Sequence, residues 1–348
     1  MKKTNGFLYL QLAEKIQRMI SEGVYGVGDK LPSVRSLHQE HGISISTALQ
    51  VYTHLEKKGW VTSREKSGYF VHYSHRVRPR LPAVTDPLPT PASVQINEKL
   101  ATFRKMSLSH KTIVSLIGAS PDTSILPAVK LKKALQLTAR ELDASYIPYS
   151  DIRGHEPFRK HIARHCLNWG RAVSPQEIIV TNGAIEAAVL CLRAVAKAGD
   201  TIAIESPTFF GLLLGIESLG MKALEIPTDP VTGISLDKLE DAFKKKKVRA
   251  CLLVTNYNNP LGSCIPDNKK EQLAKMLQQY QVPLIEDDVY GDLHFAPERP
   301  RTIKSYDEEG LVLYCSSWSK SIAAGLRVGW VIGGRYHEKI AELKFMTS

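Results

Sequence analysis

A proline-dense stretch constrains this 348-residue chain more than any other feature, because prolines at this density exclude a helix or a central strand. It runs from Arg78-Pro-Arg-Leu-Pro82 through Asp86-Pro-Leu-Pro-Thr-Pro91 and has no apolar periodicity. We expect an extended linker over residues 74–110. It separates residues 1–73 from residues 111–348, which should fold as different domains.

The first part of the chain has the pattern of three short helices followed by a hairpin. Apolar spacing predicts a helix over 9–20, Pro32-Ser33 opens a second helix, and Ser44 can cap a third. Two strands, Trp60–Arg64 and Gly68–Val71, should follow around a tight turn. This order of elements is that of a winged helix-turn-helix, whose third helix enters the major groove of DNA.

Charge supports a nucleic-acid partner for the same part of the chain. Residues 1–80 hold 13 Lys and Arg against 6 Asp and Glu, so they carry +7 of the net charge of +11. A basic excess confined to one region favours a polyanion. We expect residues of the second helix, the third helix and the wing to contact double-stranded DNA: Ser33, Arg35, Ser44, Ser46, Thr47, Gln50, Arg64, Lys66 and Gly68.

The segment of residues 7–72 closely resembles the GntR family of DNA-binding regulators. The matching segments are Gly28–Leu37, Gly42–Thr47, Leu55–Gly59 and Ser67–Val71. The resemblance implies a winged helix that binds promoter DNA. The alternative is a winged helix that makes only protein contacts.

One residue of the third helix departs from that family's pattern. Many members carry an arginine directly after the first serine of this helix, where this chain has Ile45. An isoleucine cannot bond guanine or phosphate, so the base preference should differ.

Beyond the linker, apolar runs alternate with helical stretches. This alternation predicts an α/β domain with a mainly parallel sheet, whose ligand lies at the carboxyl ends of the strands. The expected strands are Ile178–Val180, Thr201–Ile204, Ala223–Ile226, Ala250–Val254, Pro283–Ile285, Leu311–Leu313 and Val328–Ile332.

The string Ser316-Ser-Trp-Ser-Lys320 ends one of these runs, and Arg327 follows seven residues later in Ala-Gly-Leu-Arg-Val-Gly. It resembles the lysine signature of fold-type-I aminotransferases, which bind pyridoxal 5′-phosphate (PLP). The resemblance implies that Lys320 forms an imine with PLP and is the catalytic residue. It also implies that Ser317 and Arg327 hold the phosphate. Alone, this short string is also typical of a surface lysine.

Two further motifs of that family follow strands. In Glu286-Asp287-Asp288-Val-Tyr290, the resemblance implies that Asp287 pairs with the pyridine nitrogen and Tyr290 reaches the phenolate oxygen, with Asp288 as the alternative to Asp287. In Asn256-Tyr-Asn-Asn259-Pro-Leu-Gly262, Asn259 would bond the same oxygen. Taken singly, these strings also suit an acidic turn and an Asn-Pro turn.

The turn Thr181–Glu186 opens a helix after the Ile178 strand, and free backbone N–H groups at such a position bind anions. The resemblance assigns phosphate binding to Gly183, Ala184 and Ile185. Most relatives have a hydroxyl residue and a glutamine where this chain has Ala184 and Ile185. The main-chain contacts can survive this change, whereas the side-chain contacts cannot.

Two aromatic residues complete the expected PLP site. The segment Glu205–Gly211 resembles the one that supplies the ring stacked on the cofactor, for which we choose Phe209 over Phe210. The loop Tyr149–Gly154 resembles the one whose tyrosine reaches the phosphate of the partner subunit. Tyr149 therefore implies a homodimer.

The two domains together resemble the MocR subfamily of GntR-type regulators, most closely its YdcR-like group. This resemblance implies a dimeric transcription regulator that senses PLP, or an amine or amino acid that reacts with it, through Lys320. The alternative is an active aminotransferase with an accessory winged helix.

The chain ends at Ser348, before the small domain and the carboxylate-binding arginine that such relatives carry. We expect little or no transamination from it. A truncated chain without function is a third possibility.

Other sequence features restrict the remaining classes of function. No apolar run is long enough to cross a bilayer, and residues 1–10 make a poor signal peptide. The five cysteines are scattered and match no metal-binding pattern. We therefore expect a cytoplasmic protein without a membrane partner or a metal site.

Overall fold

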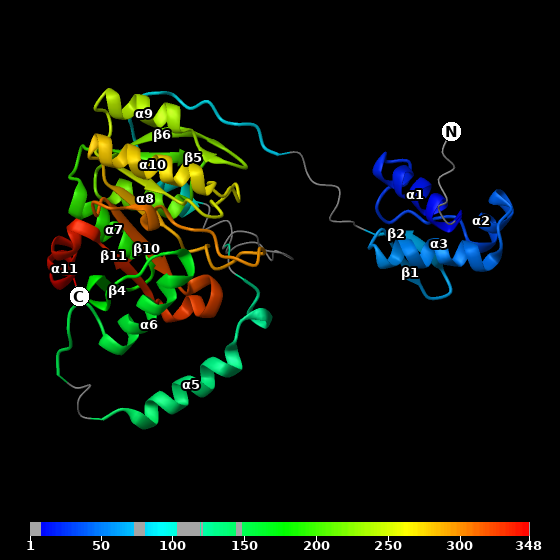
Figure 1. The fold of residues 1–348 in the computed structure, drawn as a ribbon, viewed down its shortest axis with the longest axis horizontal. Helices are drawn as coiled ribbons and strands as arrows, with labels where there is room; N and C mark the ends of the chain where they lie inside the picture. The colour runs from blue at the N-terminus through cyan, green and yellow to red at the C-terminus, as the bar shows by residue number, and fades with distance from the viewer. Residues whose placement is uncertain (1–7, 73–80, 103–118, 120, 144–147, 348) are drawn as a thin grey trace. The chain divides into compact units, whose positions relative to one another are not determined.

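The computed structural model describes residues 8–72, 81–102, 119, 121–143 and 148–347. It divides the chain into two compact units, Met1–Leu81 and Pro82–Ser348 (Figure 1). The predicted linker, residues 74–110, includes residues 74–80 and 103–110, which lie outside the described part. Residues 81–102 of the same segment belong almost entirely to the larger unit.

The smaller unit consists of three helices and a two-stranded wing. Its elements are α1 (Leu8–Ser21), α2 (Val34–His41), α3 (Ile45–Lys57), β1 (Val61–Arg64) and β2 (Gly68–Val71).

Capping fixes where α2 and α3 begin and end. The Ser33 hydroxyl accepts a bond from the backbone N–H of Ser36 at 3.0 Å, and Ser44 accepts from the N–H of Thr47 at 3.0 Å. Both serines have the extended backbone of an N-cap, which leaves the side chain free to take an orphan N–H. Gly59 has a positive φ directly after the C-cap of α3, as the sequence predicts.

The apolar stripes of the three helices share one core. Ala48, Val51, Tyr52 and Leu55 of α3 are fully buried against α1, α2 and the wing. The rings of Tyr52 and Tyr69 are stacked with centroids 4.3 Å apart, which fixes the wing on α3. β1 and β2 pair antiparallel, and the turn between them places Lys66 at φ 56°.

The larger unit is built on one mixed sheet in the order β3-β6-β5-β8-β9-β10-β11-β4, with β7 paired to β6. Pairings among β6, β5, β8, β9 and β10 are parallel, whereas β3, β7, β11 and β4 pair antiparallel. The strands are β3 (Ala92–Ser93), β4 (Ile178–Thr181), β5 (Thr201–Ser206), β6 (Lys222–Asp229), β7 (Gly233–Ile234), β8 (Ala250–Leu253), β9 (Leu284–Asp287), β10 (Val312–Ser317) and β11 (Gly329–Ile332). The mainly parallel α/β sheet confirms the predicted fold class.

Helices cover both faces of this sheet (Figure 1). Side chains of α7, α8 and α11 pack on one face, and those of α9 and α10 pack on the other, where α6 covers the end near β4. The helices are α5 (Ala128–Glu141), α6 (Glu156–Cys166), α7 (Ala184–Val195), α8 (Phe210–Ser218), α9 (Leu236–Lys244), α10 (Asp267–Tyr280) and α11 (His337–Phe345). None of the residues of α5 is buried.

Part of the proline-dense segment is bound to the sheet. β3 pairs with the edge strand β6, the Thr85 hydroxyl donates to the Ser206 carbonyl at 2.9 Å, and Glu217 accepts from the backbone N–H groups of Ile96 and Asn97. Residues 85–97 therefore have fixed contacts with the larger unit. A two-residue edge strand has no apolar alternation, so the sequence gives no sign of it.

Candidate functional site

Most of the predicted cofactor residues lie around one pocket at the carboxyl ends of β9 and β10. Its lining consists of Ala184, Ile185, Phe209, Val254, Asp287, Val289, Tyr290, Ser317, Ser319, Lys320 and Arg327. These residues come from several distant segments, which the parallel strands bring to one edge of the sheet.

Lys320 lies on a π-helical turn, Ser319–Ala323, directly after β10. Such turns often occur at functional sites because they re-aim single side chains. The Lys320 ammonium donates to the carbonyl of Ala119 at 2.9 Å and lies 5.6 Å from the centroid of the Tyr290 ring. Burial lowers the pKa of Lys320, and the charge of Arg327 lowers it further while Asp287 opposes both. A lowered pKa favours the neutral amine, which is the nucleophilic form.

Asp287 is 3% exposed, ends β9 and lines the same pocket. Its carboxylate accepts one bond, from the Val289 N–H at 3.3 Å, and forms no ion pair with any described residue. Burial and the neighbouring charge of Asp288 raise the pKa of Asp287 to about 7, against the opposing effect of Lys320. A buried carboxylate without an ion-pair partner is costly to ionise, so it favours a ligand that brings a cation or a hydrogen-bond donor.

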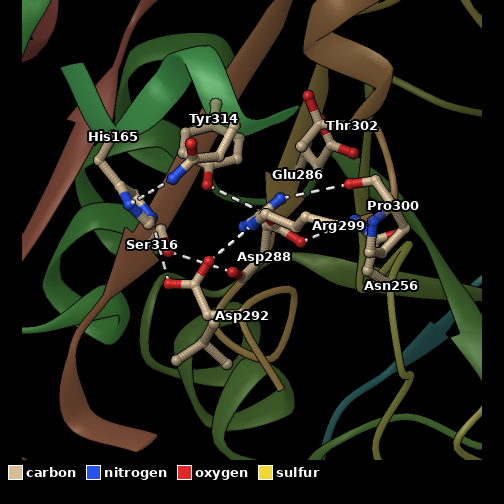
Figure 2. A network of polar contacts seen from close by, with 12 residues as sticks. His165, Asn256, Glu286, Asp288, Asp292, Arg299, Pro300, Thr302, Tyr314 and Ser316 are labelled. Carbon is tan, nitrogen blue, oxygen red and sulfur yellow. Dashed lines mark hydrogen bonds and ion pairs between the residues drawn. The ribbon is translucent and has the colours of Figure 1, made fainter. Parts of the chain in front are cut away.

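Asp288 turns away from the pocket into a buried polar network (Figure 2). It pairs with Arg299 at 2.6 Å and accepts from the Asn256 amide and the Tyr314 hydroxyl, both at 2.9 Å. Arg299 also pairs with Asp292 at 2.6 Å. Asp288 is therefore fully partnered, whereas the adjacent Asp287 faces the pocket.

The network extends from Asp292 to His165, whose Nε2 lies 3.1 Å from the carboxylate. Burial raises the pKa of Asp292, but the neighbouring His165 and Arg299 outweigh it and lower that pKa to about 2. Sequence reasoning did not identify Arg299. The sequence does contain an indication of such a residue, because the three successive acids Glu286–Asp288 at the end of a buried strand require cations or N–H donors.

Tyr290 and Asn259 form a pair, although only Tyr290 lines the pocket. The Asn259 amide donates to the Tyr290 hydroxyl at 2.9 Å. Asn259 lies in the β8–α10 connection and Tyr290 in the β9–β10 connection, and the bond fixes the orientation of the phenol. The second amide N–H of Asn259 and the hydroxyl hydrogen of Tyr290 can donate to an oxygen in the pocket.

The turn before α7 and Arg327 form the other end of the pocket. α7 begins after Gly183, which has φ 83° and supplies no capping side chain, so the first N–H groups of the helix lack a side-chain cap. A Cβ at Gly183 would lie 2.3 Å from Nη2 of Arg327, and that guanidinium donates to the Asn182 carbonyl at 3.3 Å. Helix N–H groups beside a guanidinium and the buried Ser317 suit a phosphate.

The two aromatic candidates differ in position. Phe209 lines the pocket, whereas Phe210 is the first residue of α8, and their ring centroids are 4.6 Å apart. Tyr149 is not brought to the pocket of its own chain and its side chain is fully exposed.

Some of the predicted DNA-contacting residues of the smaller unit are simply exposed, whereas others also have a structural role. Arg35, Ser46, Gln50, Arg64 and Lys66 are exposed. The Arg64 guanidinium lies 4.1 Å from the centroid of the Phe70 ring. The remaining predicted residues have structural roles as well: Ser33 and Ser44 cap helices, Thr47 is half-buried beside the Ser44 hydroxyl, and Gly68 has φ 103°.

No helix in the described parts of the chain is both long and apolar enough to cross a membrane. The pocket and its immediate surroundings bring together a lysine, an aspartate without an ion-pair partner among the described residues, a phenol that is hydrogen-bonded to an amide, an aromatic ring and an anion cup. All of them are supplied by the larger unit.

Comparison with known proteins identifies both units. Residues 8–71 match the model of bacterial regulatory proteins of the gntR family, and residues 117–346 match the model of aminotransferase class I and II. The chain is 40% identical over 340 residues to the HTH-type transcriptional regulator YjiR of Escherichia coli K12 and 37% identical to YdcR of the same strain. Each alignment covers 98% of this chain and 72% of the relative.

A solved structure has the same fold as the larger unit. It is LysN, an alpha-aminoadipate aminotransferase from Thermus thermophilus complexed with N-(5′-phosphopyridoxyl)-L-leucine, with 24% identity and a TM-score of 0.64. The match covers 74% of this chain and 64% of that one, so this chain spans less than two thirds of it. The chain belongs to the MocR-type regulators of the GntR family, in which a helix-turn-helix domain is fused to an aminotransferase class I and II domain.

Proposed function

We propose that this protein is a cytoplasmic transcription regulator that binds double-stranded promoter DNA through residues 8–72 and holds PLP on Lys320. One observation supports the cofactor more than any other. Asp287 is buried, forms no ion pair with any described residue, and lines the pocket that also presents the amine of Lys320. A protonated pyridine nitrogen would supply the missing positive charge.

The other residues of the pocket fit the remaining parts of PLP. Bound PLP supplies an aldehyde that reacts reversibly with primary amines and a ring that withdraws electrons. Phe209 would cover a face of the ring, and the Asn259–Tyr290 pair would bond the phenolate oxygen. Gly183, Ala184, Ile185, Ser317 and Arg327 would hold the phosphate. Lys320 would be the point of covalent attachment, and its lowered pKa supports this role.

The proposed signal is an amine or amino acid, or PLP itself. An amine that competes with Lys320 would free the lysine side chain, which would then regain its charge in the pocket. Regulation would follow if the two forms of the pocket favour DNA-bound and DNA-free arrangements to different extents.

The exposed residues of the larger unit support a homodimer. Tyr149 is fully exposed, and α5 presents Val129, Leu135 and Leu137 to solvent with exposed fractions of 84%, 54% and 47%. Exposed apolar side chains on a helix and an exposed tyrosine would be covered in a dimer. We propose that Tyr149 reaches the phosphate held by the partner subunit.

The second candidate function is an active aminotransferase, which the assembled cofactor residues favour. Transamination also needs a cation for the substrate carboxylate. Arg327 is the one arginine among the described residues that line the pocket, and the proposal uses it for phosphate. We therefore propose little or no transamination by this chain.

Spectroscopy and mass spectrometry test the proposal directly. PLP added to the full chain should give the visible absorption of a lysine-bound cofactor. Borohydride reduction should then fix the cofactor mass on the peptide that contains Lys320. Lys320→Ala should lose both signals and keep its affinity for DNA. Attachment at another lysine, or no attachment, would contradict the cofactor assignment.

A further inference from the structure

Two apolar side chains face solvent on the first two turns of α3. The exposed fractions of Ile45 and Leu49 are 55% and 47%. They are four residues apart, so they lie next to each other on the helix surface. The core-facing positions of the same helix are filled by other residues, which are buried. Core packing therefore does not account for Ile45 and Leu49.

The surroundings of this apolar pair favour DNA over a protein surface as its occupant. Ser46 and Gln50 are exposed on the same helix, and Arg35 is exposed at the start of α2. Residues 1–80 carry a net charge of +7. A polyanion complements this unit, and the N-terminal turns of the third helix are those that reach base edges in a winged helix-turn-helix.

We propose that Ile45 and Leu49 read thymine by contact with its C5-methyl group. Thymine carries the one methyl group on the major-groove edge of the four bases, so an aliphatic side chain distinguishes it by apolar contact. The operator should then contain A·T pairs where it meets the start of α3. Ser46 and Gln50 would supply hydrogen bonds to neighbouring positions. This inference depends on the proposed DNA binding and identifies the bases that the site prefers.

The test compares thymine with deoxyuridine, which has the same hydrogen-bonding groups and lacks the methyl. Binding sites are first selected from random duplexes with the full chain. Each thymine of the selected site is then replaced singly by deoxyuridine. At the positions that meet Ile45 and Leu49, the affinity should fall about fourfold per methyl, as expected for the loss of one buried methyl.

Variants assign the effect to these side chains. I45A combined with L49A should bind the thymine and deoxyuridine duplexes within about twofold of each other, because the contact is already lost. I45V keeps a branched aliphatic group and should retain most of the preference. V24A and V27A remove apolar groups that are 59% and 65% exposed outside α3, and they should leave the preference unchanged.

Three results would count against the inference. Equal affinity for thymine and deoxyuridine at every position would overturn it, as would a thymine preference that survives in the I45A and L49A double variant. Binding to all duplexes without selection would also overturn it, while leaving DNA binding in place. Failure to bind any DNA would contradict the proposed function itself.

Discussion

The two units of the molecule place their charged residues in opposite ways. In the smaller unit, Arg35, Arg64 and Lys66 are exposed on a scaffold whose core is apolar. In the larger unit, Asp287, Asp288 and Arg299 are buried, and each has a different set of partners. Exposed charges can be exchanged at little cost in stability, whereas each buried charge depends on its neighbours.

The largest effect should follow the loss of Arg299. Arg299→Met removes the cation between Asp288 and Asp292 and leaves the buried Asp288 carboxylate and the half-buried Asp292 carboxylate without it. Removing one partner of a buried pair costs about 3–5 kcal/mol, and denaturant unfolding should show a loss of this size. As a control, Lys244→Met breaks the surface pair with Glu240 and should cost far less stability than Arg299→Met, because both groups are solvent-exposed. Equal losses for both variants would remove the contrast between buried and exposed charge.

Asp287→Asn should have opposite effects on cofactor binding and on stability. The raised pKa of Asp287, about 7, means that the cofactor-free folded protein holds this proton at higher pH than the unfolded chain does. Its stability therefore falls as pH rises from about 4 to about 7. The variant avoids this loss, so at pH 8 it should be more stable by about 2–4 kcal/mol, with little gain at pH 4.

The same variant should bind PLP at least about tenfold more weakly, since it no longer offers a full charge to the ring nitrogen. Asp229→Asn is the matched control. The N–H groups of Thr232 and Val231 lower the pKa of Asp229, so that variant should lose stability above pH 4 instead of gaining it. A stability gain without loss of PLP affinity would remove Asp287 from the cofactor site.

In the smaller unit, the helix caps should matter more for stability than the exposed hydroxyl groups. Ser44→Ala removes the cap of α3 and should destabilise this unit by about 1 kcal/mol in thermal unfolding. Ser46→Ala leaves the bond from Thr47 to Ser44 in place and should cost less than half as much. Similar losses for the two variants would show that the cap is not what starts α3.

The smallest effect on stability should come from Arg35. Arg35→Ala removes an exposed side chain, so the unfolding free energy should change by no more than about 0.5 kcal/mol. If Arg35 contacts phosphate, DNA binding should weaken several-fold and the slope of log affinity against log salt should shrink by about one. An unchanged salt slope would place Arg35 outside the DNA interface.

The two units also differ in how far their sequences predict them. In the smaller unit, Ser33, Ser44 and Gly59 act on residues within one helical turn, so the sequence predicts the ends of both helices. In the larger unit, the apolar runs from Ile178 onward predict the central strands within a few residues. The family motifs name most of the residues that line the pocket, although Tyr149 and Asn259 do not line it. The local sequence determines the helix ends and the strands because capping and apolar periodicity act over short distances.

The remaining features depend on side-chain orientation and on distant contacts. The sequence leaves open whether Asp287 or Asp288 faces the pocket, and the structure distinguishes them through Arg299, eleven residues beyond Asp288. β3 pairs through backbone groups alone, and the Thr85 hydroxyl bonds a backbone carbonyl 121 residues away, so local sequence predicts neither contact. The exposure of Tyr149 likewise depends on packing that one motif cannot specify.

We propose that this one protein couples a PLP-holding lysine to DNA binding. The most direct test measures DNA affinity of the full chain without PLP, with PLP, and with PLP plus a series of amines, while visible absorption reports on Lys320. We expect that an amine that changes the absorption also changes DNA affinity at least about fivefold, and that Lys320→Ala shows neither change. DNA affinity that stays constant while the absorption changes would contradict it.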